Sequence, residues 1–398
     1  MQDEIFPDED DFGRVFRNNA VLSDAGVPQY AAIMGNCVAG GAYLPVLCDK
    51  MLMTEGSSLY LAGPSLVKAA IGQVIEEEEL GGAQMHATVS GTIDFREVDD
   101  EACLARLRTL VEMLPAERYA FDSIAADAIK TESPWENLYQ LISPKEKTEY
   151  DARDLIACMV DEGSVNEYKA EYGQTLVTTF AKIGGRSVGI VANQGKRVDS
   201  QQGGIQIGGV VCADSADKAA KFVTDCNQMG VPIVFLQNVT GFMVGRDAEH
   251  SGIIQSGARL VHAVSNSVVP RITVIVGGSF GAGSYALCGK AFDPHFIYAW
   301  PGASYAVMGG VQAASTLLAL EKRRIEREGG GMSDEELAEL QHMIEENYQT
   351  QTDIRYGAAR GWIDAVIAPE TTRSVLIQSL DYATRPHLVK THAVPRYV

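Results

Sequence analysis

A glycine-rich segment that occurs twice constrains the fold of this chain most. Residues 269–285 read VPRITVIVGGSFGAGSY, and residues 27–43 read VPQYAAIMGNCVAGGAY. The initial valine and proline, two of the glycines and the final tyrosine recur at the same positions without a gap. A shared order of this kind indicates a duplicated structural unit. We therefore predict two copies of one domain, and we align residues 60–64 with residues 298–302 as a continuation of the repeat.

The second copy shows most clearly what the glycines do. They follow a β-branched apolar run at residues 272–276, which predicts a buried strand, and residues 285–287 favour a helix. Glycines let the backbone approach another group closely because no Cβ intervenes. A strand, a glycine loop and a helix start together present backbone N–H groups to developing negative charge. A plain tight turn remains the alternative for one loop alone, but two such loops suggest two oxyanions in one reaction.

Length and composition fit this interpretation. The 398 residues, 46% hydrophobic with 39 glycines, suit an α/β protein of two or three domains. A net charge of −19 argues against nucleic acid or an anionic membrane as partner. No apolar run approaches a membrane span, and the acidic opening lacks the features of a signal or transit peptide. The seven cysteines include no CxxC pair, which favours the cytoplasm and argues against a zinc site.

The organisation along the chain is asymmetric. Strands predicted at 186–193 and 231–236, with a helix at 214–229 capped by Asp214 or Ser215, come before the second glycine loop. The first copy has no counterpart of them, so we expect it to lack its front half, either because the chain is a fragment or because another chain supplies the strands. We assign residues 1–118 to a partial N-terminal domain, 119–150 to a linker and 151–398 to a C-terminal domain. Further helices are expected at 102–114, 154–160, 317–328, 333–348 (with a Ser333–Glu336 capping box) and 371–384.

Catalytic side chains are hard to find. The histidines lack HExxH spacing, no GxSxG elbow is present, and no GxGxxG opens a helix in a dinucleotide-binding context. Five residues instead of four separate Gly283 from Gly289, so a phosphate-binding P-loop is rejected. A lone His86 or His262 is more often a core or surface residue than a base. The remaining candidates are the backbone N–H groups of the two glycine loops. Such a site fits a reaction whose base comes from a substrate or cofactor.

Several motifs carry a family resemblance along essentially the whole chain. They are GNCVAGGAYLP at 35–45, FLQNVTGFMVG at 235–245, GGSFGAGSY at 277–285, VMGG at 307–310 and DAVI at 364–367. The chain resembles the carboxyltransferase (beta) subunits of biotin-dependent acyl-CoA carboxylases, and GAGSY is closest to the methylcrotonyl-CoA type. Residues 194–209 are also similar to the alpha subunit of glutaconyl-CoA decarboxylase. The resemblance implies an α/β fold of two crotonase-like (ClpP/crotonase) ββα-spiral domains.

The resemblance also implies a mechanism. The acyl-CoA would bind the N-terminal copy, and carboxybiotin, carried on a separate protein, would reach the C-terminal copy. N–H groups of Ala282 and Gly283 would stabilise the ureido oxyanion left by loss of CO2. The biotin nitrogen would then take the acidic proton of the acyl-CoA. N–H groups of Gly40 and Gly41 would stabilise the thioester enolate, which attacks CO2.

Further site residues follow from the same resemblance. It implies acyl-CoA contacts at Ala39, Ala42, Tyr43 and Gly63, biotin contacts at Phe280, Gly281, Tyr285 and Gly309, and no metal. Arg14, Arg17 and Lys68 are basic candidates for the CoA phosphates. Val311 replaces a glutamate of the family pattern and Phe95 a polar residue, which leaves the acyl group open.

The implied partners are a biotin carboxylase and a biotin carboxyl carrier subunit or domain. We expect a homodimer or homohexamer, because in the family the N-terminal copy of one chain faces the C-terminal copy of another. Two alternatives stay open: the alpha subunit of a glutaconyl-CoA-type decarboxylase, and a truncated, non-catalytic assembly subunit.

Overall fold

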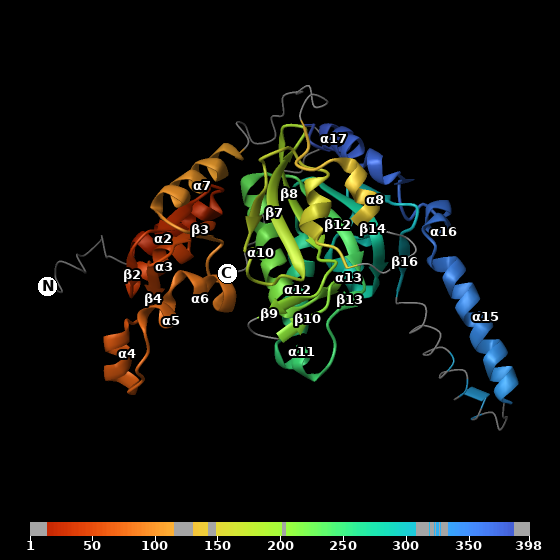
Figure 1. The fold of residues 1–398 in the computed structure, drawn as a ribbon, viewed down its shortest axis with the longest axis horizontal. Coiled ribbons are helices and arrows are strands. Elements are labelled where there is room, and N and C mark those ends of the chain that lie inside the picture. The colour runs from red at the N-terminus through yellow and green to blue at the C-terminus, as the bar shows by residue number, and fades with distance from the viewer. Residues whose placement is uncertain are drawn as a thin grey trace.

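The fold has two lobes, each built on its own β-sheet (Figure 1). The computed structural model describes residues 14–114, 130–141, 149–200, 204–307 and 333–385, and the single residues 318, 322, 324, 325 and 327. Most of the predicted linker and of the predicted helix at 317–328 lies outside these residues. Within the described parts of the chain, no helix is long and apolar enough to cross a bilayer.

The N-terminal lobe contains a small parallel sheet with the order β1-β3-β5. A second parallel pair joins β2 to β4. Apolar side chains from both sheets and from the turn before β5 form one core of this lobe. Leu52 and Phe95 on the other face of the three-stranded sheet belong to the core of the C-terminal lobe, so this sheet is covered on both faces. The strands are β1 (Tyr30–Ile33), β2 (Asn36–Val38), β3 (Lys50–Thr54), β4 (Ser58–Tyr60) and β5 (Phe95–Glu97), and the helices are α2 (Arg14–Asp24), α3 (Gly40–Val46), α4 (Pro64–Ile71), α5 (Glu77–Gly81), α6 (Ala83–Met85) and α7 (Asp100–Glu112).

The C-terminal lobe is built on an eight-stranded sheet with the order β17-β15-β14-β12-β8-β7-β6, to which β16 adds beside β14. The strands from β8 through β12, β14 and β15 to β17 run parallel, and β6, β7 and β8 pair antiparallel. The bounds are β6 (Asn166–Tyr168), β7 (Leu176–Ile183), β8 (Arg186–Asn193), β12 (Ile233–Val239), β14 (Arg271–Phe280), β15 (Phe296–Ala299), β16 (Ser304–Ala306) and β17 (Ala365–Val366).

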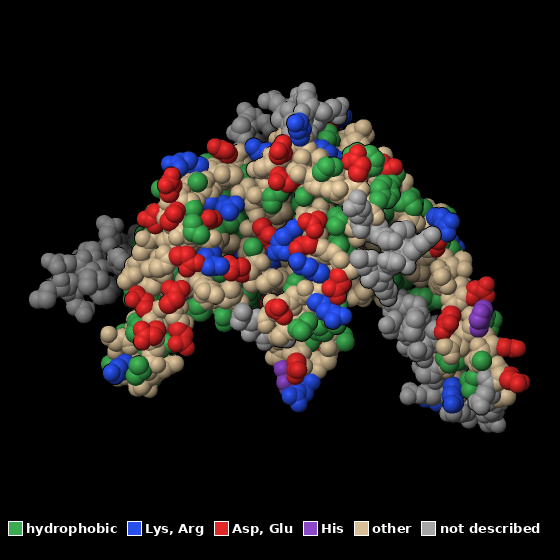
Figure 2. Space-filling model, viewed as in Figure 1, with side chains coloured by type: hydrophobic (Ala, Val, Ile, Leu, Met, Phe, Trp, Pro, Cys, Tyr) green, Lys and Arg blue, Asp and Glu red, His purple; other side chains and the backbone are tan. Residues whose placement is uncertain are grey.

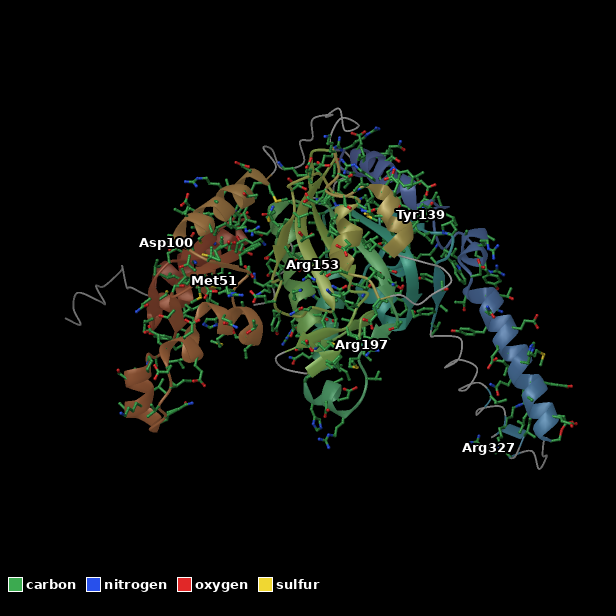
Figure 3. All side chains as sticks on the ribbon, viewed as in Figure 1. Met51, Asp100, Tyr139, Arg153, Arg197 and Arg327 are labelled. Atoms are coloured by element: carbon green, nitrogen blue, oxygen red, sulfur yellow. The ribbon has the colours of Figure 1, made fainter. Side chains whose placement is uncertain are left out.

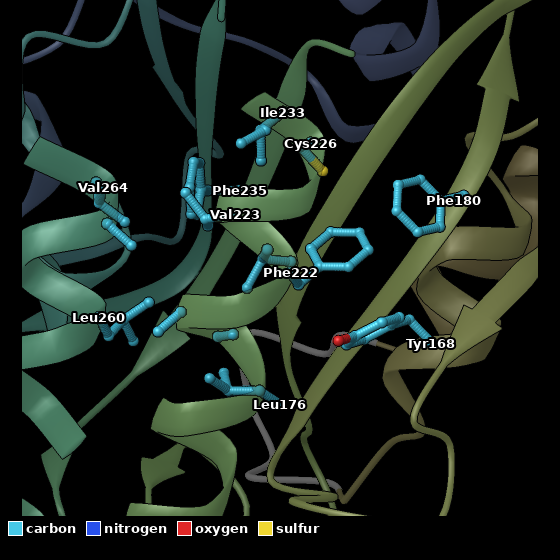
Figure 4. Packing of buried hydrophobic residues seen from close by; sticks show 14 of the residues in the cluster. Tyr168, Leu176, Phe180, Phe222, Val223, Cys226, Ile233, Phe235, Leu260 and Val264 are labelled. Carbon is cyan, nitrogen blue, oxygen red and sulfur yellow. The ribbon is translucent and has the colours of Figure 1, made fainter. Parts of the chain in front are cut away.

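Helices cover both faces of this sheet, which explains why its central strands read as continuous apolar runs. On one face α10 (Ala213–Met229) and α12 (Ile253–Ser265) share a core with β7 and β12. Figure 4 shows Phe222 of α10 beside Phe180 of β7, with ring centroids 4.7 Å apart. On the other face α9 (Ala152–Ala157) and α17 (Thr372–Ala383) form a second core.

The remaining elements are short, apart from α15. They are α8 (Leu138–Leu141), β9 (Val198–Ser200), β10 (Gly204–Gln206), β11 (Val210–Val211), β13 (Gly241–Phe242), α11 (Arg246–His250), α13 (Gly281–Ala286), α15 (Asp334–Thr352) and α16 (Ile354–Ala359). The predicted capping box of Ser333 and Glu336 is confirmed at the start of α15. The predicted cap of α10 is wrong: Cys212 is the N-cap, and the Ser215 hydroxyl accepts a hydrogen bond from the Cys212 backbone N–H at 2.9 Å.

Strand register supports the duplication that the sequence predicts. In both copies the residues before the glycines (β1 and the start of β14) pair in parallel with the first strand after the loop (β3 and β15). The residues among the glycines (β2 and the end of β14) pair in parallel with the second strand after the loop (β4 and β16). The equivalent pairs are Tyr30–Lys50 with Ile272–Phe296, and Asn36–Ser58 with Gly278–Ser304. The two copies therefore agree in both pairings, and the N-terminal lobe repeats the half of the C-terminal sheet formed by β14, β15, β16 and β17.

The register corrects one part of the predicted alignment. Tyr60 ends β4 and corresponds to Ala306 of β16, whereas Tyr298 lies in β15 and corresponds to Leu52 of β3. Aligning residues 60–64 with 298–302 is therefore wrong. The reason is a longer connection between the glycine loop and the next strand in the second copy, which shifts everything after it.

The two lobes share a further repeat, which the glycine-loop pattern does not include. Both lobes contain a Gly-x-Ile-Asp turn before the last strand of the unit (β5 and β17), at residues 91–94 and 361–364. Gly91 and Gly361 have φ values of 62° and 67°. The Asp94 carboxylate accepts a hydrogen bond from the Met51 N–H at 2.9 Å, and Asp364 accepts one from the Ile297 N–H at 2.7 Å. A lysine also donates to each glycine carbonyl: Lys169 to Gly91 and Lys290 to Gly361.

Buried charges join the two lobes. The Lys50 side chain of β3 is fully buried, and its Nζ lies 2.5 Å from Asp225 Oδ2 of α10. Asp94 lies 3.2 Å from Lys169 Nζ and 3.6 Å from Lys221 Nζ. Burial alone would raise the pKa of Asp94, but Lys221, Lys169 and Lys50 together lower it to about 2. The lobes thus meet partly through paired charges, since an unpaired charge would be costly to bury. They also meet through apolar packing, with the Phe95 ring 6.1 Å from that of Tyr168.

Arginine side chains on the visible surface form ion pairs with nearby glutamates. Acidic side chains are spread over the visible face of both lobes, and basic ones collect near the centre of the view (Figure 2). Arg153 and Arg197 lie at that place (Figure 3). Arg153 pairs with Glu167 at 2.6 Å, and Arg197 with Glu149 at 3.2 Å. The charges of these two arginines are therefore offset by neighbouring glutamates.

Candidate active site

The first glycine loop connects β2 to α3. Ala39 forms the turn with a φ of 56°, and its N–H donates to the Tyr60 carbonyl of β4 at 3.1 Å. Gly40 and Gly41 are the first two residues of α3. N–H groups in the first turn of a helix have no acceptor within that helix, so these glycines supply two adjacent backbone donors. A Cβ on Gly41 would meet no atom within 4 Å, which leaves open space beside them.

The other residues expected on the acyl-CoA side divide into two groups. Ala42 packs into the core of the N-terminal lobe, so only its backbone is available, whereas Tyr43 is 51% exposed. Gly63 caps α4 just after β4, where a Cβ would lie 3.3 Å from the Tyr60 ring. Lys68 lies in the last turn of α4. The structure thus brings Ala39, Gly40, Gly41 and Tyr43 together in one turn; the side chains of Arg14 and Arg17 lie outside the described part.

The second glycine loop connects β14 to α13 and packs more tightly. Gly281 has a φ of 55°, and a Cβ there would lie 2.9 Å from the Val307 carbonyl oxygen. A Cβ on Gly283 would lie 2.5 Å from Val239 Cγ2, closer than side chains approach one another. Ala282 between them is exposed. The two glycines are therefore required by close packing against neighbouring backbone and side chains, while the residue between them faces no such limit.

The residues expected on the biotin side surround this loop. Phe280 and Gly281 are half-buried, and Tyr285 is 43% exposed with its ring 6.1 Å from that of Phe292. Gly309 lies outside the described residues. The loop therefore combines backbone donors at the start of α13 with an accessible aromatic side chain on the same short helix.

Buried polar side chains behind the second loop were not predicted. Gln237, Ser279 and Ser284 are all at most 3% exposed and bond to one another. The Gly278 N–H donates to Asn238 Oδ1 at 2.9 Å, and a Cβ on Gly277 would lie 2.3 Å from the same oxygen. The signal in the sequence is the polar pair Gln237-Asn238 at the end of an otherwise apolar strand, which the motif at 235–245 already contained.

Histidines are engaged in structural contacts. His86 is buried, its Nδ1 lies 2.8 Å from Ser90 Oγ, and its Nε2 lies 2.7 Å from the Leu59 carbonyl oxygen. Burial lowers the pKa of His86. His295 Nδ1 accepts a hydrogen bond from the Arg271 N–H. Among the residues that the structure describes, no group of three or more His, Cys, Asp or Glu side chains is placed to hold a metal ion.

The two glycine loops lie in different lobes of one chain. Figure 1 places α3 in the N-terminal lobe and α13 in the C-terminal lobe. The helix α3 packs on α2, β1 and β2, while α13 packs on α12, β12, β13 and β14. Each loop is thus complete in its own lobe, and one chain alone does not bring them face to face.

Comparison with known proteins places this architecture in a family. The Carboxyl transferase domain family matches residues 1–393. The chain is 40% identical over 377 residues to the biotin-dependent 3-methylcrotonyl-coenzyme A carboxylase beta1 subunit of Mycobacterium tuberculosis, covering 94% of this chain and 68% of that protein. It is also 40% identical to the mitochondrial methylcrotonoyl-CoA carboxylase beta chain of Dictyostelium discoideum, covering 95% of this chain but 62% of that protein. The chain therefore spans about two thirds of the length of the first relative and less than two thirds of the length of the second.

A decarboxylase subunit and solved structures extend the comparison. The methylmalonyl-CoA decarboxylase subunit alpha of Propionigenium modestum is 32% identical, over 93% of this chain and 68% of its own length. Transcarboxylase 12S, solved with methylmalonyl-coenzyme A and methylmalonic acid bound, has a TM-score of 0.83 at 35% identity, covering 97% of this chain and 70% of its own. The beta subunit of geranyl-CoA carboxylase from P. aeruginosa has a TM-score of 0.55 at 32% identity, covering 96% and 69%. These matches confirm the predicted resemblance and the crotonase-like α/β fold: the chain belongs to the carboxyl transferase domain family.

Proposed function

We propose that this chain is the carboxyltransferase component of a biotin-dependent acyl-CoA carboxylase. The observation that carries the proposal is the pair of equivalent loops, in which Ala39 and Gly281 adopt φ values of 56° and 55° directly before two backbone donors. One reaction that needs two separate oxyanion sites is the transfer of a carboxyl group between two substrates that each develop charge on oxygen. The 40% identity to methylcrotonyl-CoA carboxylase beta subunits supports the same activity.

The first loop would serve the acyl-CoA. The N–H groups of Gly40 and Gly41 would donate to the thioester oxygen as it gains charge on loss of the acidic proton. Open space beside Gly41 fits a substrate carbonyl, because a Cβ there would meet no atom within 4 Å. Each backbone donor of this kind is worth about 3 kcal/mol in the transition state. Ala39 and Tyr43, with Gly63 on the adjoining strand end, would line the approach of the pantetheine arm.

The second loop would serve the carboxyl donor. Carboxybiotin, when bound, supplies the carboxyl group and a nitrogen able to take the acyl-CoA proton. The N–H groups of Ala282 and Gly283 would donate to the ureido oxygen, and Phe280, Gly281, Tyr285 and Gly309 would surround the ring. The site fits a flat polar ring, since Ala282 is exposed and Tyr285 is 43% exposed beside it. With no side-chain base required, the residues of this chain act by orientation and charge stabilisation, and orientation alone contributes up to roughly 7–11 kcal/mol.

A second copy of the chain would bring the two loops together. Because α3 and α13 lie in different lobes of one chain (Figure 1), we propose that the N-terminal loop of one subunit faces the C-terminal loop of another in a homodimer or homohexamer. A related transcarboxylase 12S forms a hexamer. The biotin carboxylase and the biotin carboxyl carrier would be separate partners.

Subunit mixing tests this arrangement. Gly41→Val blocks the first loop and Gly283→Val the second, so each variant alone should be inactive. Refolding or co-expressing the two together creates interfaces in which an intact first loop faces an intact second loop, and these should regain part of the wild-type rate. A mixed oligomer that forms but stays inactive would show that the active site does not combine the first loop of one subunit with the second loop of another.

Transfer from free carboxybiotin to a panel of CoA thioesters tests the activity itself. We expect methylcrotonyl-CoA to accept the carboxyl group faster than propionyl-CoA or acetyl-CoA, because the relatives at 40% identity carry that name. Absence of transfer to every thioester by a folded oligomer would contradict the proposal and favour an assembly subunit.

A decarboxylase alpha subunit is the alternative supported by an observation, the 32% identity to the Propionigenium modestum protein. The same loops would then work in the opposite direction and load biotin from a carboxylated thioester. A gene neighbourhood with biotin carboxylase supports the carboxylase, and one with a membrane ion-pump subunit supports the decarboxylase.

The proposal also covers the cell compartment and the domain boundaries. We place the protein in the cytoplasm, and the unpaired state of all seven cysteines supports a reducing compartment; cell fractionation tests it. We also keep the division into residues 1–118, 119–150 and 151–398, which limited proteolysis within 119–150 would support.

A further inference from the structure

A ring of hydrogen bonds lies behind the second glycine loop. Ser279 Oγ lies 2.6 Å from Gln237 Oε1 and 2.8 Å from Ser284 Oγ. Gln237 Nε2 lies 2.7 Å from the Leu287 carbonyl oxygen and 3.3 Å from that of Ser284. The ring therefore links β12, the end of β14, the helix α13 and Leu287, which follows this helix.

The chemistry of the groups fixes the direction of each bond. A glutamine carbonyl oxygen only accepts, so Ser279 donates to Gln237, and Ser284 must then donate to Ser279. The Gln237 amide donates its two hydrogens to the carbonyls of Ser284 and Leu287. Every polar atom of the three side chains is used, and all three side chains are at most 3% exposed. Buried networks satisfied in this way are rigid, since breaking one bond leaves a desolvated polar group.

Close packing strengthens the same support. A Cβ on Gly289 would lie 2.6 Å from Ser284 Oγ, and the Gly289 N–H donates to the Ser284 carbonyl at 2.8 Å. Gly283, the residue before Ser284, packs against Val239 of β12. The short helix α13 is thus fixed at its buried side by residues that the reaction would not touch.

The first loop lacks this support. The strand register places Cys37 at the position of Ser279 and Ala42 at the position of Ser284. Cys37 Sγ makes one local contact, 3.3 Å from the Gly41 carbonyl oxygen, and Ala42 has no polar side chain. The ring is therefore a property of the second loop, and the duplicated fold alone does not account for it.

We propose that Gln237, Ser279 and Ser284 are positioning residues for carboxyl transfer, holding α13 so that the N–H groups of Ala282 and Gly283 keep a fixed place. This inference rests on the proposed function of the second loop. The inference can also be tested without the reaction, because it predicts that the ring restricts the motion of the loop in the absence of any substrate.

The test uses Ser284→Ala and Gln237→Met, which keep volume but remove ring bonds. Ser379→Ala is the matched control: Ser379 is 4% exposed, lies on α17 and bonds the Tyr298 hydroxyl at 2.8 Å. We expect kcat for transfer to fall about tenfold in Ser284→Ala, the size of one lost hydrogen bond, and roughly a hundredfold in Gln237→Met. The KM for acyl-CoA should stay unchanged, and Ser379→Ala should keep the wild-type kcat.

Hydrogen exchange provides a readout that does not need activity. Amides of residues 281–287 should exchange at least about tenfold faster in Ser284→Ala than in wild type or Ser379→Ala, because one bond that closes the ring is lost. Unchanged exchange and unchanged kcat in both ring variants would overturn the inference, as would equal changes in Ser379→Ala. If wild type transfers no carboxyl group, the proposed function fails, and exchange at 281–287 alone then decides whether the ring holds the loop.

Discussion

Ala39 and Gly281 adopt the same left-handed φ, 56° and 55°, at equivalent positions of the two glycine loops. Ala39 directly precedes α3, and Gly281 is the first residue of α13; in each loop the next two N–H groups form the proposed oxyanion site. Such a φ is rare for a residue with a Cβ, so the N-terminal loop holds an alanine in a conformation that costs free energy. The strained position is retained at a site of proposed function, where the loop geometry matters more than local stability.

Exchanging the two residue types should change stability in opposite directions. Ala39→Gly relieves the strain and should stabilise the protein by about 1 kcal/mol after the entropic cost of glycine. Gly281→Ala should destabilise by about 1–3 kcal/mol, because its Cβ would also lie 2.9 Å from the Val307 carbonyl oxygen. Thermal unfolding of both variants beside wild type measures the effect. Destabilisation by Ala39→Gly would mean that the alanine is not strained.

A methyl group on Gly283 should abolish most of the transfer activity. In Gly283→Ala the added carbon would lie 2.5 Å from Val239 Cγ2, so the backbone of α13 must move and its N–H groups leave the ureido oxygen. We expect kcat to fall about 10²–10³-fold, the range found for loss of an oxyanion donor. Acyl-CoA binding, measured by calorimetry, should be retained because that substrate would bind the other lobe. Equal loss of binding and transfer would mean that the loop serves only the fold.

The equivalent aspartates Asp94 and Asp364 should differ sharply in their contribution to stability. Asp94→Asn removes a buried charge that faces Lys169 and Lys221, and should destabilise by about 3–5 kcal/mol. Asp364 is exposed and bonds the Ile297 N–H, so Asp364→Asn should cost less than about 1.5 kcal/mol. Urea unfolding of the two variants compares them directly. Similar losses would show that the backbone bond, rather than the buried charge, is what matters.

Acid should remove the contribution of Asp94. Its pKa is lowered from 3.8 to about 2 in the folded protein, so the unfolded state binds the proton first as pH falls. The stabilisation is therefore fully present above about pH 4 and is lost between there and pH 2. Wild-type stability should decline over this range more steeply than that of Asp94→Asn. Parallel curves for the two proteins would contradict the assignment.

Replacing histidines should leave the chemistry nearly intact. His86→Gln, His262→Gln and His295→Gln should each lower transfer by less than the roughly 10²–10⁴-fold attributed to a general base. His86 instead affects stability: its folded pKa lies below the ordinary 6.5, so the unfolded state takes up a proton first and stability falls as pH drops below about 6.5. His86→Gln should lack this dependence. A variant that folds, binds acyl-CoA and still loses a thousandfold in rate would contradict a mechanism without a side-chain base.

The amino-acid sequence alone was sufficient to predict the duplicated unit and the position of both glycine loops. Repeated glycines after a β-branched run act locally, through allowed φ values and the absence of a Cβ, so their effect is visible in a short stretch. For the same reason the Ser333–Glu336 capping box and strand β8 were predicted at their observed positions. The family motifs additionally predicted the α/β fold class and the residues of the loops.

The contacts that support those loops and join the lobes depend on the three-dimensional packing of distant segments. Gln237 meets Ser279 because β12 and β14 are parallel neighbours, and it meets Ser284 because α13 packs on both strands. Lys50 meets Asp225 across the lobe junction, 175 residues apart. Partners of this kind cannot be derived from local pattern, since a buried polar group is satisfied by whichever segment the packing brings to it. The register shift that misaligned Tyr60 has the same origin, because pairing between strands is fixed by the sheet and a longer connection leaves no mark in either strand.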